Sequence, residues 1–395
     1  MAFLSLVSIT GALILSTLKS MSISMPPELQ YRIALTMAPA IGPVTARKLI
    51  KEAGSARAVF HMSQSTLQKV PGIGPLMSGS ILSSSLLDKA AREMEFIQQH
   101  KISVLFLKDP EYPQRLTECR DAPILLYACG SKGLNSKKAL SVVGTRRASA
   151  YGRDLCRNLV FELAAKIEDL VIISGLAYGI DVIAHRAALE AGIPTIAVLG
   201  HGLSTIYPGS HRATASRISE QGCLVSDFHS GMGPERNNFL RRNRIIAGMA
   251  DATLVVESAA EGGALITAGL ASSYDRDVLA VPGRAHDERS RGCNNLIKYH
   301  VAALVESAED IIYHLNWSDE GSQAGRRTAE SVSLTGQEKQ LLELLSEHGG
   351  LRPEELCAYS GIPVQQVLST LVALELKACV SVEPGNLYQS TRMGP

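Results

Sequence analysis

The segment 141–152, SVVGTRRASAYG, joins the end of an apolar run to a glycine turn and the start of a helical pattern. Gly144 ends the apolar run, Arg146 and Arg147 follow, and Ser149 precedes the helical pattern. A turn between a strand and a helix exposes backbone N–H groups at the positive end of the helix dipole, so this segment favours an anion. Three anions fit the pattern: a dinucleotide cofactor, a small phosphorylated substrate and the backbone of a nucleic acid.

Short apolar runs alternate with helix-length segments from about Ile102 to Leu315. This alternation predicts an α/β fold with a parallel, doubly wound sheet. The predicted strands are 102–107, 139–143, 170–173, 194–199, 223–226, 252–256 and 277–281. Ligands of such sheets bind beyond the carboxyl ends of the strands. Glycine and charged residues cluster at these ends, at 144–147, 174–181, 200–202, 257–263 and 282–284.

The region 25–100 has the pattern of a helix-hairpin-helix domain. APAIGPVTARKLI (38–50) and LQKVPGIGPLMSGSIL (67–82) each place a glycine–proline turn before a helix rich in small residues. The turns contain Gly42 in one segment and Gly72 and Gly74 in the other. Their backbone N–H groups could hold a DNA phosphate without reading sequence. A purely structural packing role is an equal alternative, because the turns carry few cations.

The polar segment 316–333 has no periodicity and is interpreted as a linker within the chain. After it, 334–391 predicts a winged helix: helices at 335–347, 353–360 and 363–375, then two short strands around a Pro-Gly-Asn turn. The third helix has no arginine or lysine before Lys377. We therefore expect this domain to dock a protein or act as a spacer rather than read the major groove of DNA.

The composition is that of a globular protein with several domains: 395 residues, of which 46% are hydrophobic and 19% charged. A net charge of +1 excludes a uniformly basic protein, so phosphate binding must come from local arginine clusters, found at 146–157 and 236–244. The seven cysteines contain no C-x-x-C pair. This argues against disulfides or structural zinc and fits a reducing cytoplasm.

Residues 1–24 include an almost uncharged stretch, AFLSLVSITGALILSTL (2–18). Its composition resembles a signal peptide or a marginal membrane span. No basic segment precedes it, and Met21 and Met25 stand just before a plausible domain start. These features favour a start codon assigned too far upstream, or an N-terminal extension, over a membrane anchor. No later segment is long and apolar enough to span a bilayer. We therefore expect a cytoplasmic protein without a membrane partner.

The common enzyme signatures are missing from the sequence. GHGLST (200–205) is the nearest match to a dinucleotide motif, but Thr205 replaces the third glycine, and P-loop, G-x-S-x-G and H-E-x-x-H motifs do not occur. We therefore predict no cofactor, no metal site and no catalytic residue. Asp181 and His185 could form an acid/base pair on one helical face. The favoured interpretation is that Asp181 serves the helix N-terminus and His185 bonds nearby backbone.

Six collinear motifs resemble those of the DNA-processing protein A family (DprA, also called Smf). They are VVGTRRASAYG, ISGLAYGIDVIAH, AVLGHGLSTIYP, NNFLRRNRIIAG, ESAAEGGALITA and VPGRAHDERSRGCNNLI. The helix-hairpin-helix (SAM-like) and winged-helix regions also resemble the family's flanking domains. The resemblance implies an extended Rossmann-like domain, here 101–315, that binds single-stranded DNA without a dinucleotide. It also implies a homodimer that loads the RecA recombinase onto incoming strands during natural transformation.

The resemblance implies a DNA pocket on three turns. Its residues are Gly144, Thr145 and Arg146, with the adjacent Arg147 and Ser149; Ser174, Gly175 and Gly179; and Phe239, Arg242, Asn243 and Arg244. Two positions depart from the family pattern: Leu240 replaces a usual proline, and Glu261 replaces a frequent basic residue, which weakens phosphate binding at the pocket edge. The candidates for base stacking are Tyr151, Tyr178, Tyr207 and Phe239, with core packing as the alternative.

A nucleotide hydrolase is the alternative function. Related folds cleave the N-glycosidic bond of nucleoside monophosphates with a glycine-rich phosphate turn and acidic residues, here Glu257 and Glu261. The P-G-G-x-G-T-x-x-E type of motif that would accompany this activity is not found. The preferred hypothesis is therefore a DNA-binding mediator without enzymatic activity. In this hypothesis the anion is the backbone of single-stranded DNA, held by the turn N–H groups, Arg146, Arg242 and Arg244.

Overall fold

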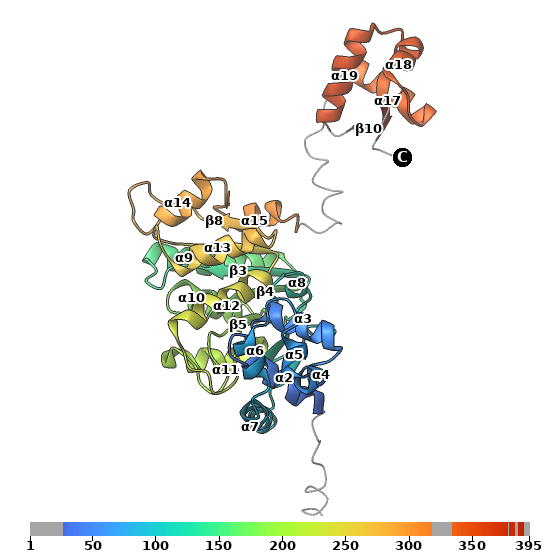
Figure 1. Ribbon diagram of the computed structural model, residues 1–395. Coiled ribbons are helices and arrows are strands. Elements are labelled where there is room, and N and C mark those ends of the chain that lie inside the picture. Colours follow the sequence, from blue (N-terminus) through green and yellow to red (C-terminus); the bar gives the residue numbers. More distant parts are fainter. Residues whose placement is uncertain (1–26, 318–333, 378, 384–385, 391–395) are drawn as a thin grey trace, which may run out of the picture. The chain divides into compact units, whose positions relative to one another are not determined.

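The computed structural model describes residues 27–317, 334–377, 379–383 and 386–390 (Figure 1). The chain divides into two compact units, 1–317 and 318–395. The N-terminal stretch 1–24 and nearly all of the linker 316–333 lie outside the described residues, so their interpretations stay predictions.

A nine-stranded sheet forms the centre of the first unit, in the order β1-β2-β6-β5-β4-β3-β7-β8-β9. The antiparallel pairs are β1–β2 and β2–β6, and all other neighbours are parallel, which confirms the doubly wound, mostly parallel fold. The strands are β1 (Ser103–Phe106), β2 (Leu125–Gly130), β3 (Lys138–Val143), β4 (Leu170–Ser174), β5 (Thr195–Val198), β6 (Cys223–Ser226), β7 (Ala252–Val255), β8 (Asp277–Ala280) and β9 (Ala303–Leu304). Strands β2 and β9 were not predicted from the sequence. The run LLYACG of β2 is apolar enough to be recognised, whereas β9 has two residues.

Helices cover both faces of this sheet (Figure 1). One face packs against α9 (Ala150–Lys166), α10 (Ile180–Glu190), α11 (Arg212–Gln221) and α15 (Ala308–His314). The other face packs against α8 (Gln114–Thr117), α12 (Arg236–Gly248), α13 (Gly263–Ser273) and α14 (Arg291–Lys298). Successive residues of one strand belong to the two different cores, because successive side chains point to opposite faces of the sheet. In β3, Ala139 packs on one face and Leu140 on the other.

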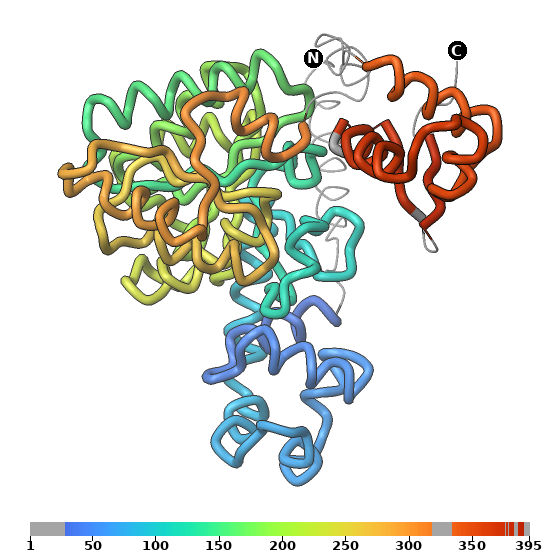
Figure 2. Tube along the Cα trace, turned by 90° about the horizontal axis from the view of Figure 1, so that it is seen from above, coloured from blue at the N-terminus to red at the C-terminus, as the bar shows by residue number. Residues whose placement is uncertain are grey.

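The helical N-terminal region packs on the antiparallel end of the sheet (Figure 2). It consists of α2 (Pro27–Met37), α3 (Pro43–Ala53), α4 (Ala56–His61), α5 (Gln64–Leu67), α6 (Pro75–Ile81) and α7 (Ser85–Gln99). Gly42 and Gly74 cap α3 and α6, and a proline follows each glycine, as the helix-hairpin-helix prediction requires. This region shares one apolar core with Leu125 and Tyr127 of β2, so it is fastened to the sheet.

The second unit is the predicted winged helix. It contains α17 (Gly336–His348), α18 (Pro353–Ser360) and α19 (Val364–Leu376), followed by the antiparallel strands β10 (Val380–Glu383) and β11 (Leu387–Ser390). Its core includes Leu341, Leu356 and Leu371. Within the described ranges, no single helix is long and apolar enough to cross a membrane, and only the bent pair α18 and α19 meets the length and composition criterion together.

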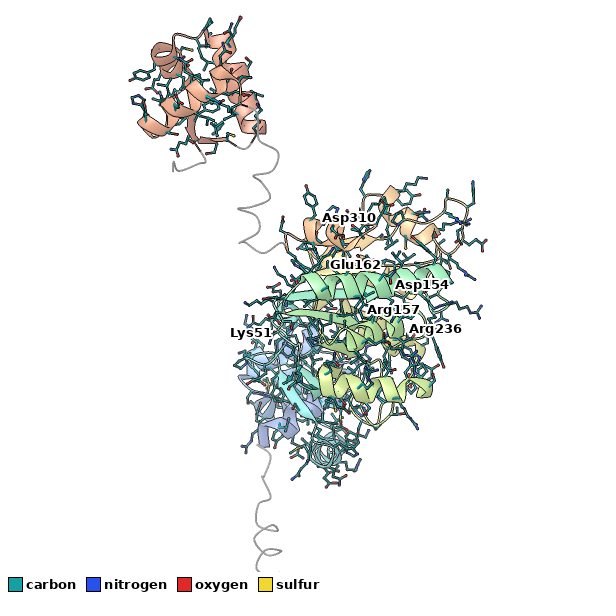
Figure 3. All side chains as sticks on the ribbon, turned by 180° about the vertical axis from the view of Figure 1, so that it is seen from behind. Lys51, Asp154, Arg157, Glu162, Arg236 and Asp310 are labelled. Carbon is teal, nitrogen blue, oxygen red and sulfur yellow. The ribbon has the colours of Figure 1, made fainter. Side chains whose placement is uncertain are left out.

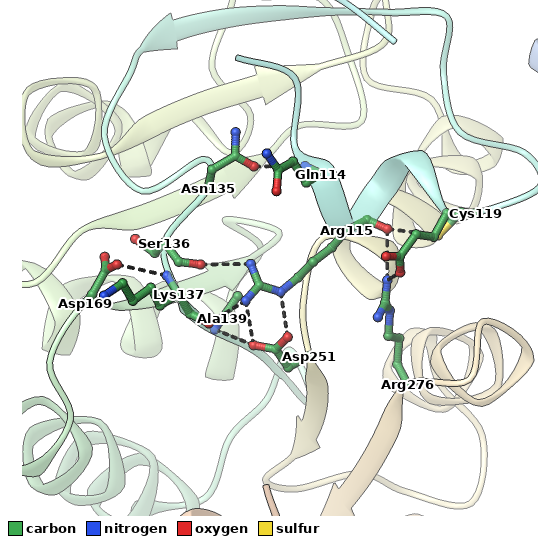
Figure 4. Close-up of polar contacts among 11 residues, drawn as sticks. Gln114, Arg115, Cys119, Asn135, Ser136, Lys137, Ala139, Asp169, Asp251 and Arg276 are labelled. Carbon is green, nitrogen blue, oxygen red and sulfur yellow. Dashed lines mark hydrogen bonds and ion pairs between the residues drawn. The ribbon is translucent and has the colours of Figure 1, made fainter. Parts of the chain in front are cut away.

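An arginine network holds the amino edge of the sheet, opposite the edge where the candidate site lies (Figure 4). Arg115 of α8 donates to both carboxylate oxygens of Asp251, at 2.6 and 2.9 Å, and to the carbonyls of Ser136 and Lys137 at 2.8 and 2.7 Å. Asp251 also accepts the N–H of Ala139 at 2.9 Å. One guanidinium therefore ties α8 to the starts of β3 and β7.

We expect Arg115→Ala to lower the free energy of unfolding by about 2–3 kcal/mol, because charged hydrogen bonds to partly buried groups are lost. Arg157→Ala is the matched control, since its ion pair with Glu190 leaves the two side chains 59% and 45% exposed. That control should change stability by less than about 1 kcal/mol. Denaturant titration of both variants measures the difference, and equal midpoints would contradict the role given to Arg115.

Candidate nucleic-acid interface

Two of the predicted turns meet directly at the carboxyl edge of the sheet. Gly144 and Thr145 follow β3, and the turn after β4 reaches them through Gly179 and Ile180. The N–H of Ile180 donates to the carbonyl of Thr145 at 3.2 Å. Gly179 has φ +78°, and an added Cβ would lie 2.1 Å from that same carbonyl oxygen. Only glycine therefore lets the two turns pack together.

The third turn contributes an aromatic ring to the same edge. Phe239 of α12 is half-buried and packs on Gly200, where an added Cβ would lie 2.7 Å from the ring. The guanidinium carbon of exposed Arg146 lies 5.9 Å from the Phe239 ring centroid, and the ring of Tyr207 lies 5.7 Å from it. We call Arg146, Phe239 and Tyr207 the arginine–aromatic patch. A cation beside accessible rings suits unpaired bases joined by phosphates.

The tyrosines near this edge are exposed, so core packing is wrong for Tyr151, Tyr178 and Tyr207, which are 65%, 49% and 48% exposed. Tyr178 is held in place by its neighbours. Its hydroxyl accepts a hydrogen bond from Ser210 at 3.3 Å, and its ring meets the ring of His211 edge-on with 5.0 Å between centroids.

A carboxylate occupies the start of α9, where the sequence predicted free N–H groups. Glu257, which follows β7, is 6% exposed and accepts the N–H of Ser149 at 2.8 Å through its side chain. Its backbone carbonyl accepts the N–H of Thr145 at 2.7 Å. In dinucleotide-binding folds this switch point between β3 and β7 holds the phosphates. Here the carboxylate of Glu257 already bonds the N–H of Ser149 at this helix N-terminus, which differs from the expectation of free N–H groups.

Arg242 lies beneath the patch and not on it. Its side chain is buried and donates to the carbonyl of Gly175 at 2.7 Å and to that of Val198, so it links the ends of β4 and β5. Burial lowers the pKa of Arg242 to about 10, while the charge of Asp181 opposes that change. Burial raises the pKa of Asp181, and the charge of Arg242 opposes it. Arg242 and Asp181 are thus two buried groups of opposite charge, and each favours the charged form of the other.

Arg244, Asn243 and Ser174 are also directed inward. Arg244 forms a buried ion pair with Asp227 at 2.5 Å and donates to the carbonyl of Asp121. Asn243 donates to the carbonyl of Gly263 at 3.3 Å, and Ser174 donates to that of Val142 at 2.6 Å. The expectation that Arg242 and Arg244 face phosphates therefore needs correction, because intramolecular acceptors surround both guanidinium groups.

The exposed arginines of the third turn are Arg236 and Arg241. Figure 3 shows Arg236 on the same side of the molecule as Asp154, a residue in the first part of α9. Arg241 lies over the ring of Phe228, 5.1 Å from its centroid. Helical periodicity does not separate these two residues from the buried arginines, because at 3.6 residues per turn Arg244 lies between Arg236 and Arg241 around the helix.

The acid/base pair, which was the less favoured interpretation of Asp181 and His185, does not form. His185 is fully buried, and its Nδ1 lies 2.7 Å from the hydroxyl of Thr195. Because that hydroxyl donates to the carbonyl of Ile172, Nδ1 carries the proton and donates. Asp181 accepts the N–H of Ala177 at 3.4 Å near the start of α10, as the favoured interpretation required. His185 therefore bonds the side chain of Thr195, and a backbone hydrogen bond at Ser174 also acts on its ring, in keeping with the favoured interpretation.

The two departures from the family pattern, Leu240 and Glu261, are both exposed. Glu261 lies in the loop before α13 and is free of the buried network around Glu257. Among the residues that the structure describes, no group of histidine, cysteine, aspartate or glutamate side chains is arranged to hold a metal ion.

We expect the stability of the protein to depend on His185 below neutral pH. Burial lowers the pKa of His185 to about 3. Between about pH 3 and pH 6.5, His185 is therefore neutral in the folded protein and protonated in the unfolded chain. Stability from the neutral ring is therefore complete above about pH 6.5 and falls by about 1.4 kcal/mol per pH unit towards pH 3. In His185→Gln, which keeps a donor for Thr195, the unfolded chain binds one proton fewer. The slope of stability against pH should therefore be smaller by about 1.4 kcal/mol per pH unit. Denaturant titrations between pH 4 and pH 7 would contradict the account if both slopes were the same.

Comparisons with known proteins identify the family to which the chain is similar. The family model for DNA recombination-mediator protein A matches residues 103–316, the DprA winged helix domain matches 326–386, and a SAM-like helix-hairpin-helix tandem matches 33–81. A putative DNA processing protein DprA of Mycobacterium tuberculosis is 34% identical over 313 residues, covering 76% of this chain and 80% of the relative. Protein Smf of Escherichia coli is 36% identical over 287 residues, covering 71% and 75%.

Solved structures give the same result. DprA from Streptococcus pneumoniae superimposes with a TM-score of 0.60 at 30% identity, over 72% of this chain and 97% of that one. DprA from Helicobacter pylori, whose structure concerns its single-stranded DNA binding mode, gives a TM-score of 0.50 at 28% identity, over 55% and 96%. From its three matched domains, its relatives and its fold, this chain belongs to the DprA/Smf family of DNA-processing proteins.

Proposed function

We propose that this protein binds single-stranded DNA at the carboxyl edge of its sheet and acts as a recombination mediator without turnover. The observation that carries the proposal is the arginine–aromatic patch, in which exposed Arg146 stands beside the rings of Phe239 and Tyr207. The single-stranded DNA binding mode of the Helicobacter pylori relative supports it.

The patch favours single strands over duplexes because its rings need accessible base faces. Bases of a single strand can stack on Phe239 and Tyr207, whereas the bases of a duplex are already stacked on one another. Arg146 and Arg147 supply phosphate contacts through their side chains, since Glu257 occupies the N–H groups of Thr145 and Ser149. These contacts are independent of base sequence.

Family membership supports the wider role. A recombination mediator hands its strand to a recombinase, so we propose that the protein loads RecA onto incoming DNA during natural transformation, in the cytoplasm. It does so as a homodimer. Strand β9 lies at the end of the sheet, and exposed apolar side chains surround it: Tyr299, Val301 and Leu304, at 66%, 40% and 44%. An unpaired, apolar edge suits a second copy related by two-fold symmetry.

The nucleotide-hydrolase alternative has no support from the geometry. The inward carboxylate of Glu257 is held by Ser149, and Glu261 is exposed on the neighbouring loop.

The proposal predicts that single-stranded DNA binds more tightly than duplex DNA of the same length, at every salt concentration. Nucleoside monophosphate should compete weakly and should not be cleaved, because a single phosphate reaches few of the contacts. Fluorescence anisotropy across a salt series, with AMP as competitor, measures this. Release of free base from AMP would instead establish the hydrolase.

Phe239→Leu should weaken single-strand binding by a factor of about 5–150, since stacking contributes about 1–3 kcal/mol per base. Leucine still fills the space over Gly200, so the fold is kept. The matched control is Leu240→Ala, because Leu240 is the exposed neighbour on the same helix. RecA assembly on single strands should fall in step with DNA affinity. Full affinity in Phe239→Leu would exclude the patch as the stacking site.

Leu304→Asp should convert the homodimer to a monomer, because the substitution places a carboxylate on the proposed two-fold contact. Light scattering coupled to size exclusion measures the mass. Leu76→Asp is the control, since Leu76 is 91% exposed on α6, away from β9. A dimer that survives Leu304→Asp would place the interface elsewhere.

A further inference from the structure

Helix α19 of the winged helix carries an apolar stripe that its own unit leaves exposed. Val364, Leu368 and Val372 are four residues apart and so lie on one face of the helix. They are 50%, 44% and 53% exposed. Another face of α19 supplies the core of the unit through Val367, Leu371 and Leu374, which are fully buried. A continuous apolar stripe on an exposed helix marks a contact with another macromolecule.

The charges of this unit exclude nucleic acid as the occupant of the stripe. Residues 334–391 contain seven glutamates but three basic residues, Lys339, Arg352 and Lys377. Helix α19 itself contains no arginine or lysine, and Lys377 just beyond it is paired with Glu338 at 2.6 Å. DNA binding draws its affinity from cations placed against phosphates, which this face lacks.

We propose that the stripe binds the same stripe of a second copy of this chain, with the two α19 helices antiparallel. A two-fold axis at Leu368 sets Leu368 against its own copy and Val364 against Val372 of the other chain, so every apolar side chain meets an apolar side chain. The stripe is self-complementary because valines stand four residues to either side of the leucine.

The polar residues around the stripe suit this arrangement. Gln365, Gln366 and Ser369 are exposed and uncharged, so no like charges face each other across the contact. Glu375 lies on the same line as the stripe, three residues beyond Val372. In the antiparallel pair it comes opposite the N-terminus of the other α19, where the helix dipole favours a carboxylate.

The contact is too small to hold two free chains together. Helix α19 has 13 residues, which makes it about 20 Å long, so the pair buries far less than the roughly 1,200 Å² typical of a stable interface. The pairing therefore forms between copies that are already joined, where the effective concentration is high. In this respect it rests on the homodimer proposed above.

Cross-linking of the full-length chain tests the pairing without DNA. In Leu368→Cys, the two introduced thiols lie on the two-fold axis, within reach of a disulfide. Mild oxidation should therefore give a covalent dimer on a non-reducing gel. The control is Gln366→Cys, an exposed position turned about 160° away from Leu368 around the helix. We expect at least a tenfold higher yield at Leu368, with peptide mapping showing the symmetric linkage.

Equal yields at the two positions, no covalent dimer in Leu368→Cys, or linkage of the introduced thiol to a native cysteine would each overturn the pairing. The mass of the wild-type protein separates this failure from that of the homodimer. A dimeric wild type without the cross-link overturns the stripe contact alone, whereas a monomeric wild type without it overturns both.

Discussion

The hydrogen bond between the carboxylate of Glu257 and the N–H of Ser149 determines what kind of ligand this sheet edge can accept. It places a negative charge at the N-terminus of α9, which is where a Rossmann-like fold otherwise holds the phosphates of a nucleotide. Gly152 belongs to the same arrangement, since an added Cβ would lie 2.7 Å from a carboxylate oxygen of Glu257. The carboxylate thus stands where the phosphate of a cofactor would lie, and the proposed binding depends on side chains that project beyond the turn.

A second buried charge supports the surface from below. Arg242 joins the carbonyl ends of β4 and β5, and an added Cβ at Gly175 would lie 2.4 Å from its guanidinium. The same helix carries Phe239 to Gly200, beside Arg146. The position of the aromatic ring thus depends on a salt-bridged and hydrogen-bonded helix, so substitutions of Arg242 would act on DNA binding through position and not through lost phosphate contact.

The sequence predicted the architecture well because its signals are local. Apolar runs bounded by glycine marked the parallel strands, and glycine–proline turns marked the starts of α3 and α6. The antiparallel β2 was missed although its run is apolar, and β9 is too short for a pattern. Gly144, Arg146, Gly179 and Phe239 do gather at one edge.

The direction of the polar side chains could not be predicted from the sequence. Arg242 and Arg244 fit a basic cluster, yet both are satisfied by distant acceptors, the carbonyls of β4 and β5 and the carboxylate of Asp227. Likewise, the partner of Ser149 lies 108 residues along the chain. Such pairings depend on where α12 crosses the sheet and on the pairing of β3 with β7. A local sequence pattern contains neither piece of information.

The most direct test of the account is the salt dependence of single-strand binding in Arg146→Ala. If Arg146 neutralises a phosphate, the slope of log affinity against log salt should fall by about 0.7 in this variant. The control is Arg157→Ala, which also removes one positive charge. Because Arg157 lies on α9 and is already paired with Glu190, this variant should leave the slope unchanged. Equal slopes in the wild type and Arg146→Ala would contradict the central claim that the arginine–aromatic patch holds the DNA backbone.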